Sequence, residues 1–175
     1  MTLVSTDPDS ILKTAVEMEL QGMDFYGRAA SKMRNLRGKE MFLSLVNQER
    51  VHAEILQDQV DRLSKDKVWL PLKRLKNEAS GYPTSVFQDK DIKKIVIGPD
   101  AGELDVIKLG MEVEKKSVEF YRSAGIGIRS KNAQDIFNWL VAQETGHLTI
   151  LQAEYDYRTK SGFYMGDPEF SLEVF

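Results

Sequence analysis

The feature that most constrains this fold is an internal repeat. Shifting the 175-residue chain by 95 positions lays its second half on its first half without a gap, over about residues 11–64 and 106–160. The coincidences include many polar residues, which two unrelated amphipathic helix pairs would not give, so a duplicated helical hairpin is the natural explanation. The matched pairs that matter most below are Glu17 with Glu112, Glu19 with Glu114, Tyr26 with Tyr121, Gln48 with Gln143, Glu49 with Glu144, and His52 with His147.

Each copy of the repeat reads as two long helices, because its apolar residues recur at helical spacing. Asp7-Pro8-Asp9-Ser10 predicts the first helix start, and Ser130 predicts the start of the fourth. Asn35 to Gly38 reads as a short turn, and Gly125 and Gly127 are expected to end the third helix. The predicted helices cover about residues 11–33, 39–64, 102–124 and 130–160.

The segment between the two copies, residues 65–100, shows no long helical period and is broken by Pro71, Pro83 and Pro99. The second helix is about 40 Å long at ~1.5 Å per residue, so a connection of this length suits a crossover along its side. The sequence therefore predicts an all-α fold: a ferritin-like four-helix bundle with one long crossover between helices two and three. We expect one domain over residues 1–175, with short helices possible in the crossover. The aromatic tail, 162–175, is expected to pack on its own bundle or on a partner.

Bulk properties exclude several classes of function. The formal charge of -3 gives no global attraction for nucleic acid or membranes, and the absence of cysteine excludes disulfides and thiolate-bound metals. The first ten residues do not form a signal peptide, and no apolar run approaches a membrane span, so a cytoplasmic protein is expected. One basic cluster on the crossover is interpreted as a solvated face, with a site for an acidic redox partner or nucleic acid as the alternative. It consists of Lys65, Lys67, Lys73, Arg74 and Lys76.

The only two histidines, His52 and His147, each follow a glutamate by three residues at matched places in the repeat. Residues at this spacing share a helix face, and the rest of that face is apolar, so these side chains must point inward. With Glu19 and Glu114 in the same layer, the interior would hold four carboxylates and two imidazoles. Buried charge needs neutralisation, and two divalent cations balance four negative charges. Oxygen and nitrogen donors without sulfur favour two iron or manganese ions, with zinc possible. Glu19, Glu49, His52, Glu114, Glu144 and His147 are the predicted ligands.

These residues resemble the rubrerythrin branch of the ferritin-like superfamily across nearly all of the four helices. The resemblance rests on Glu19 and Glu114, each with a tyrosine seven residues later, and on the motifs Glu49-Arg50-Val51-His52 and Glu144-Thr145-Gly146-His147. It implies that Glu49 and Glu144 bridge the metals, that Glu19 and Glu114 are terminal carboxylates, and that each histidine binds one metal. Tyr26 and Tyr121 would orient carboxylates, although plain core aromatics are the alternative. Glu17 and Glu112 are expected to be solvated.

The resemblance also implies an activity, since rubrerythrins reduce hydrogen peroxide at a diferrous site. The expected function is an oxidoreductase that reduces peroxide or dioxygen in oxidative-stress defence, acting catalytically through the six ligands. The chain departs from typical members in two ways: it lacks rubredoxin-type cysteines, and it has Ser117 where they have a further glutamate. Electrons would therefore come from an external donor such as a rubredoxin-type protein, and the protein is expected to be a homodimer. The alternatives are a ferroxidase with iron storage, or a bundle that binds metal or partners without turnover.

Overall fold

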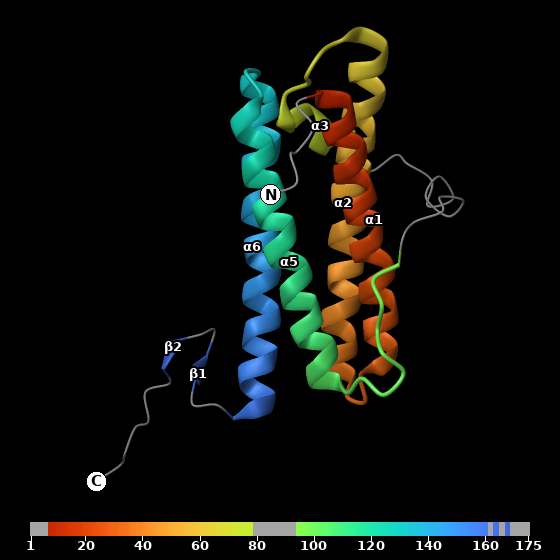
Figure 1. Cartoon of the computed structure of the whole chain (residues 1–175), viewed down its shortest axis with the longest axis vertical. Helices are drawn as coiled ribbons and strands as arrows, with labels where there is room; N and C mark the ends of the chain where they lie inside the picture. The colour runs from red at the N-terminus through yellow and green to blue at the C-terminus, as the bar shows by residue number, and fades with distance from the viewer. Residues whose placement is uncertain (1–6, 79–93, 161–162, 165–166, 169–175) are drawn as a thin grey trace.

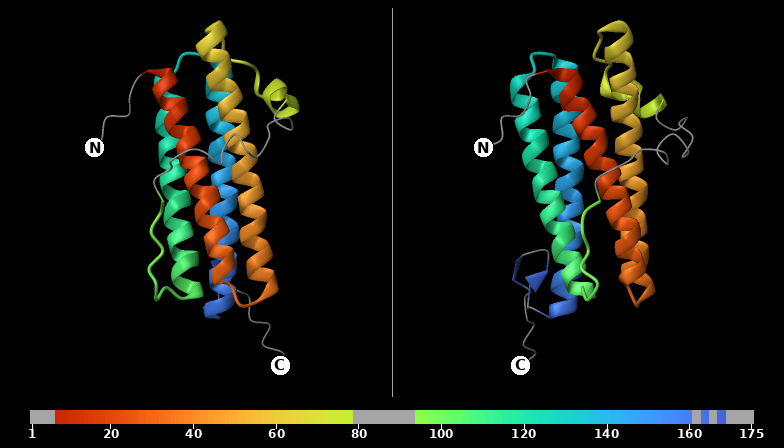
Figure 2. Two further views of the ribbon diagram at one scale, coloured as in Figure 1. Left: turned by 90° about the vertical axis from the view of Figure 1, so that its right-hand side faces the viewer. Right: turned by 45° about the vertical axis from the view of Figure 1, so that its right-hand side comes forward.

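The computed structural model describes residues 7–78, 94–160, 163–164 and 167–168 of the chain. Four long helices lie side by side as a bundle, and the described parts of the crossover, residues 65–78 and 94–100, lie on its outside (Figures 1 and 2). This architecture confirms the predicted all-α, ferritin-like fold. The elements are α1 (Pro8–Lys32), α2 (Leu36–Asp66), α3 (Leu72–Glu78), α5 (Glu103–Gly127), α6 (Lys131–Thr159), β1 (Phe163–Tyr164) and β2 (Asp167–Pro168).

Short polar side chains fix where the helices begin. Asp7 accepts a hydrogen bond from the Ser10 backbone N–H at 3.0 Å, and Ser130 accepts one from Ala133 at 3.5 Å, as predicted for helix N-caps. Asn35 caps α2 by accepting from the Gly38 N–H at 2.7 Å. This cap starts α2 at Leu36, three residues before the predicted start.

The end of α5 differs from the prediction, because the helix continues through both Gly125 and Gly127 to the C-cap Ile128. A glycine inside a helix costs only about 1 kcal/mol relative to alanine, so neighbouring structure can override it. Gly125 lies against the side chain of Phe137, where a Cβ atom would be only 3.6 Å from the Phe137 Cβ. Gly125 therefore lies in ordinary van der Waals contact with α6, and the two glycines do not end the helix.

The bundle consists of two hairpins. α1 packs along α2, and α5 packs along α6, while contacts between the two hairpins are fewer. α1 and α5 run antiparallel, as do α2 and α6, so the hairpins are related by an approximate two-fold rotation (Figure 1). Part of the crossover forms the short helix α3, which packs against α2 and α6.

The apolar core divides into two clusters along the bundle axis. One cluster includes Leu12, Leu56 and Phe137, and the other includes Phe25 and Phe42. On α2, α5 and α6 the predicted ligands fall between the segments that build these clusters, and on α1 Glu19 lies at the end of the first segment, beside Leu20. The bundle therefore holds a polar layer at mid-height, closed by apolar side chains above and below.

The chain beyond α6 forms a two-stranded antiparallel ladder that pairs Phe163 with Pro168 and Tyr164 with Asp167. β1 contacts α6, as its place beside the lower end of that helix in Figure 1 shows. Two aromatic residues of the predicted tail, Phe170 and Phe175, lie outside the described residues. No helix in the described part of the chain is long and apolar enough to cross a membrane.

Candidate metal centre

All six predicted ligands converge in the polar layer of the bundle. α1 contributes one, α2 two, α5 one and α6 two, and each side chain is at most 3% exposed. The residues are Glu19, Glu49, His52, Glu114, Glu144 and His147. Helical spacing explains their common direction, since each Glu-x-x-His pair lies on the inward face of its helix.

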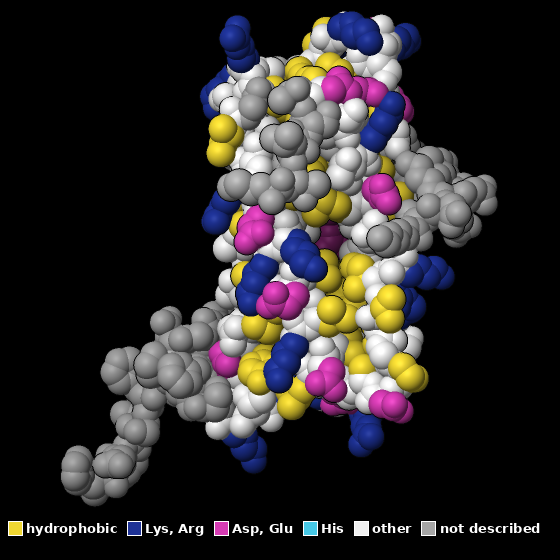
Figure 3. Space-filling view, in the orientation of Figure 1, with side chains coloured by type: hydrophobic (Ala, Val, Ile, Leu, Met, Phe, Trp, Pro, Cys, Tyr) yellow, Lys and Arg dark blue, Asp and Glu magenta, His cyan; other side chains and the backbone are white. Residues whose placement is uncertain are grey.

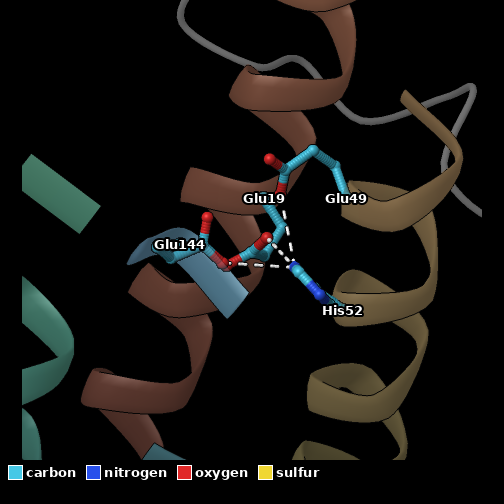
Figure 4. A group of neighbouring side chains, drawn as sticks. All are labelled: Glu19, Glu49, His52 and Glu144. Atoms are coloured by element: carbon cyan, nitrogen blue, oxygen red, sulfur yellow. Dashed lines mark hydrogen bonds and ion pairs between the residues drawn. The ribbon is translucent and has the colours of Figure 1, made fainter. Parts of the chain in front are cut away.

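These side chains form two overlapping groups, each of which could hold one metal ion. In the first group, ligand atoms of Glu19, Glu49, His52 and Glu144 all lie within 4.8 Å of one another. Figure 4 shows these four side chains pointing toward one another from α1, α2 and α6. The second group replaces Glu19 and His52 by Glu114 and His147. Glu49 and Glu144 belong to both groups, as carboxylates shared between two ions would.

The two imidazoles present equivalent atoms to the carboxylates. His52 Nδ1 lies 3.2 Å from Glu19 Oε2 and 3.2 Å from Glu144 Oε1. His147 Nδ1 lies 3.1 Å from Glu49 Oε1 and 3.1 Å from Glu144 Oε2. The rings stack with centroids 5.4 Å apart and planes inclined by 16°. Both histidines therefore turn the same nitrogen toward the carboxylates.

Tyr26 and Tyr121 each hold a carboxylate of the opposite hairpin, Glu114 and Glu19 respectively. Tyr26 Oη on α1 donates a hydrogen bond to Glu114 Oε1 on α5, and Tyr121 Oη on α5 donates to Glu19 Oε1 on α1. Burial, and then the neighbouring carboxylates, raise the pKa of both phenols well above the usual value. Both hydroxyls are therefore protonated donors at neutral pH, and they cross-link the hairpins at the level of the site.

Without cations, protons must neutralise the four carboxylates. Burial and Coulombic repulsion raise the pKa of Glu19 well above the usual value, and burial likewise raises that of Glu114. Burial opposes ionisation of the other two, yet hydrogen bonds lower the pKa of Glu49 and Glu144. For both histidines, burial lowers the pKa, but interactions with the surrounding carboxylates outweigh it and raise the pKa well above 6.5. The metal-free cluster therefore holds protons on Glu19, Glu114, His52 and His147.

The donor atoms fit a pair of divalent cations. Three buried atoms of the cluster have no hydrogen-bond partner among the described residues: Glu114 Oε2, Glu144 Oε1 and His147 Nδ1. A buried polar atom without a partner costs about 1–3 kcal/mol, and ligation would satisfy all three. Carboxylate oxygens with imidazole nitrogens are suitable donors for iron, manganese or zinc.

Three residues that sequence reasoning did not assign to the site lie around it. His147 Nε2 donates to Gln48 Oε1 at 3.3 Å, which orients the ring so that Nδ1 faces the carboxylates. Trp139 lies edge-on to His52, with ring centroids 5.1 Å apart. Gly22 lies beside Glu49, where an added Cβ would be 3.4 Å from the Glu49 Cδ. Only Gln48 had a signal in the sequence, since Gln48-Glu49 repeats as Gln143-Glu144.

The solvated glutamates were predicted correctly. Glu17 and Glu112 both lie exposed on the outer faces of α1 and α5, outside the cluster. Glu112 forms a surface ion pair with Lys115 at 2.7 Å. Two matched acidic pairs, Glu19 with Glu114 and Glu49 with Glu144, therefore contribute to the polar layer, and this exposed pair does not.

Comparison with known proteins gives a fold neighbour and a family. A hypothetical protein from Pyrococcus furiosus has a solved structure that superposes with a TM-score of 0.68 at 20% identity, covering 94% of this chain and 96% of that one. This likeness shows the shared fold. No curated protein matches the sequence. The family model for rubrerythrin matches residues 10–155, which span all four long helices and all six clustered side chains. The chain therefore belongs to the rubrerythrin family.

Proposed function

We propose that this protein is an oxidoreductase that reduces hydrogen peroxide or dioxygen at a pair of iron or manganese ions, in defence against oxidative stress. The observation that carries the proposal is the pair of overlapping donor groups sharing Glu49 and Glu144. Two carboxylates common to both groups would keep two ions close enough to act on one small oxidant. Two bound ferrous ions would supply one electron each together with Lewis acidity.

The residues of the chain would fix the geometry of such a centre. Tyr26 and Tyr121 restrain the outer carboxylates through hydrogen bonds from the opposite hairpin. Gln48 restrains the His147 ring. Supporting bonds of this kind orient ligands and raise metal affinity. Because the phenols keep their protons at neutral pH, the protons needed for water formation would come from solvent instead.

In this proposal, a small oxidant approaches the centre between α1 and α5. A cavity of about 180 Å³ lies in this seam, lined in part by Met18, Gln21, Val113 and Ser117. These residues lie within one helical turn of Glu19 or Glu114. The volume corresponds to several water molecules at about 30 Å³ each, which is room enough for peroxide. Ser117 leaves this space open where typical family members have a glutamate.

Anaerobic loading followed by oxidation tests the proposal. Protein loaded with two ferrous ions per chain should be oxidised by stoichiometric peroxide, or by dioxygen, much faster than free ferrous iron under the same conditions. Optical spectra of the oxidised protein should show oxo-to-iron charge-transfer bands. Oxidation no faster than that of free iron would overturn the proposal. Continued uptake of iron beyond two ions per chain, in an assembly much larger than a dimer, would instead indicate storage.

A further inference from the structure

One aromatic side chain connects the candidate metal centre to the outer surface. Trp139 is half-buried on α6, and its ring lies 5.1 Å from the His52 ring, centroid to centroid, with planes at 87°. The Lys76 ammonium also contacts Trp139 and lies 4.4 Å from the centre of the indole ring. A chain of contacts thus runs from a ligand imidazole through an indole to an exposed lysine.

The surface at the outer end of this chain is basic. Helix α3 exposes Lys73, Arg74 and Lys76 while burying Leu75 completely in the core. The end of α2 adds exposed Lys65 and Lys67. Figure 3 shows Lys and Arg side chains at the upper end of the molecule, where α2 ends, while α3 lies on the face turned away from the viewer.

Acidic side chains only partly offset this charge. The exposed acidic residues on the last turns of α2 are Asp61 and Asp66. The chain as a whole carries a formal charge of -3, so the basic excess here runs against the overall balance. Charge of this kind favours an acidic partner and speeds its encounter.

The other half of the repeat has no such connection. The position that matches Trp139 is Ser44, which is exposed on α2. His147 is instead held by Gln48, at 3.3 Å. Among the described residues no hydrogen bond joins Gln143, the counterpart of Gln48, to His52. The contact with Trp139 is therefore made by His52 and not by His147. An electron path that reaches one side of the centre requires such a difference.

We propose that the α3 surface around Lys76 docks an acidic one-electron carrier protein, and that Trp139 conducts its electrons to the His52 side of the centre. The inference rests on the proposed function, because it assigns the source of the reducing electrons. Two reduced carriers each lose one electron; one peroxide molecule gains these two electrons and two protons, its O–O bond breaks, and two waters form. The cation above Trp139 disfavours removing an electron from the indole, so the ring transmits charge without becoming oxidised.

Binding to a carrier tests the docking surface without turnover. The probe is a reduced, acidic rubredoxin-type protein, titrated calorimetrically into the metal-loaded protein at low and high salt. Lys76→Glu should weaken binding at least about fivefold and flatten its salt dependence. Lys39→Glu makes the same charge change on an exposed residue at the start of α2 and should leave the affinity unchanged. Equal affinities for both variants would overturn the docking proposal, as would Lys76-dependent binding of an RNA oligonucleotide but not of the carrier.

Stopped-flow reduction tests the path through the indole. Trp139→Leu should slow reduction of the oxidised centre by the carrier at least about tenfold, while carrier affinity and reduction by a small neutral hydroquinone stay unchanged. Trp139→Phe retains an aromatic ring against His52 and should keep most of the rate. A wild-type rate with Trp139→Leu would overturn this path. If the carrier binds in a Lys76-dependent way but peroxide does not oxidise the loaded protein, the proposed function alone is refuted. If hydroquinone drives turnover but the carrier does not bind, this inference alone is refuted.

Discussion

The α1–α2 hairpin and the α5–α6 hairpin supply the same donor atoms to the centre, but they differ in what surrounds those atoms. Each gives one outer carboxylate, one shared carboxylate, one imidazole and one tyrosine. Around them, Gln48 contacts one imidazole and Trp139 contacts the other. Two ions of one kind need two like sets of ligands, which keeps the interior symmetric. The residues around the donor atoms are not constrained in this way, and the two hairpins differ there.

The largest expected effect concerns the two shared carboxylates, which should be equally necessary. Glu49→Gln and Glu144→Gln each remove one of four negative charges and one donor atom from both groups. Metal analysis after reconstitution should therefore fall from two ions per chain to one or none in both variants. Glu17→Gln and Glu112→Gln, the exposed matched pair, should retain two. A variant of Glu49 or Glu144 that still holds two tight ions would show that the carboxylates are not shared.

Removing the metals should make stability fall as pH rises. In the metal-free protein the pKa of Glu19, Glu114, His52 and His147 is raised, so the folded state binds more protons than the unfolded chain near neutrality. The free energy of unfolding then decreases as the pH rises above about 6.5, where the unfolded chain loses its histidine protons and the folded state keeps them. Denaturant titrations at each pH measure this slope. The metal-loaded protein, whose cations replace those protons, should lack it; a metal-free protein that gains stability over the same interval would contradict the proton inventory.

A smaller difference should separate the two glutamines. Gln48→Leu removes the acceptor that holds the His147 ring and should weaken metal binding about tenfold, as loss of a supporting ligand contact typically does. Gln143→Leu, at the matched position, should change affinity far less. Competition with a chromophoric chelator measures both constants. Equal losses would mean that Gln143 contacts His52 once the metals are bound, and that the halves differ less than the structure indicates.

The smallest effect tests a difference at the helix starts. An added Cβ at Gly38 would lie 2.6 Å from Arg158 Nη2, and Arg158 is tied to Glu103 and Glu154 by ion pairs. Gly38→Ala should cost less than about 1 kcal/mol of stability, because the gain in helix propensity offsets much of the cost of displacing the tip of the Arg158 side chain. The cost should shrink in an Arg158→Ala background. At the matched position Ala133, the reverse change to glycine should also destabilise the fold, by about 1 kcal/mol.

The sequence could predict what local periodicity and the repeat determine. Glu49 and His52 share a helix face because of their spacing, and the repeat extends the same reasoning to Glu144 and His147. The four long helices and the crossover follow from hydrophobic period and proline placement. Each of these features depends on residues close together in the chain or on the 95-residue repeat, which has no gaps.

Contacts between the hairpins could not be predicted in this way. Trp139 approaches His52 only because α6 lies against α2, and His147 reaches Gln48 across 99 residues of sequence. The crossed bonds of Tyr26 and Tyr121 likewise depend on an antiparallel arrangement of α1 and α5. Even the length of α5 was misjudged, since Gly125 and Gly127 do not end the helix.

The sharing of carboxylates between the two donor groups has a consequence for assembly. Neither hairpin contains a complete set of ligands: the first group takes Glu144 from α6, and the second takes Glu49 from α2. Each ion would therefore bind ligands from both hairpins, which otherwise make few contacts with each other. Its binding free energy would stabilise the packing of one hairpin against the other. Binding of the first ion would also position Glu49 and Glu144 for the second, so uptake of the two ions would be cooperative.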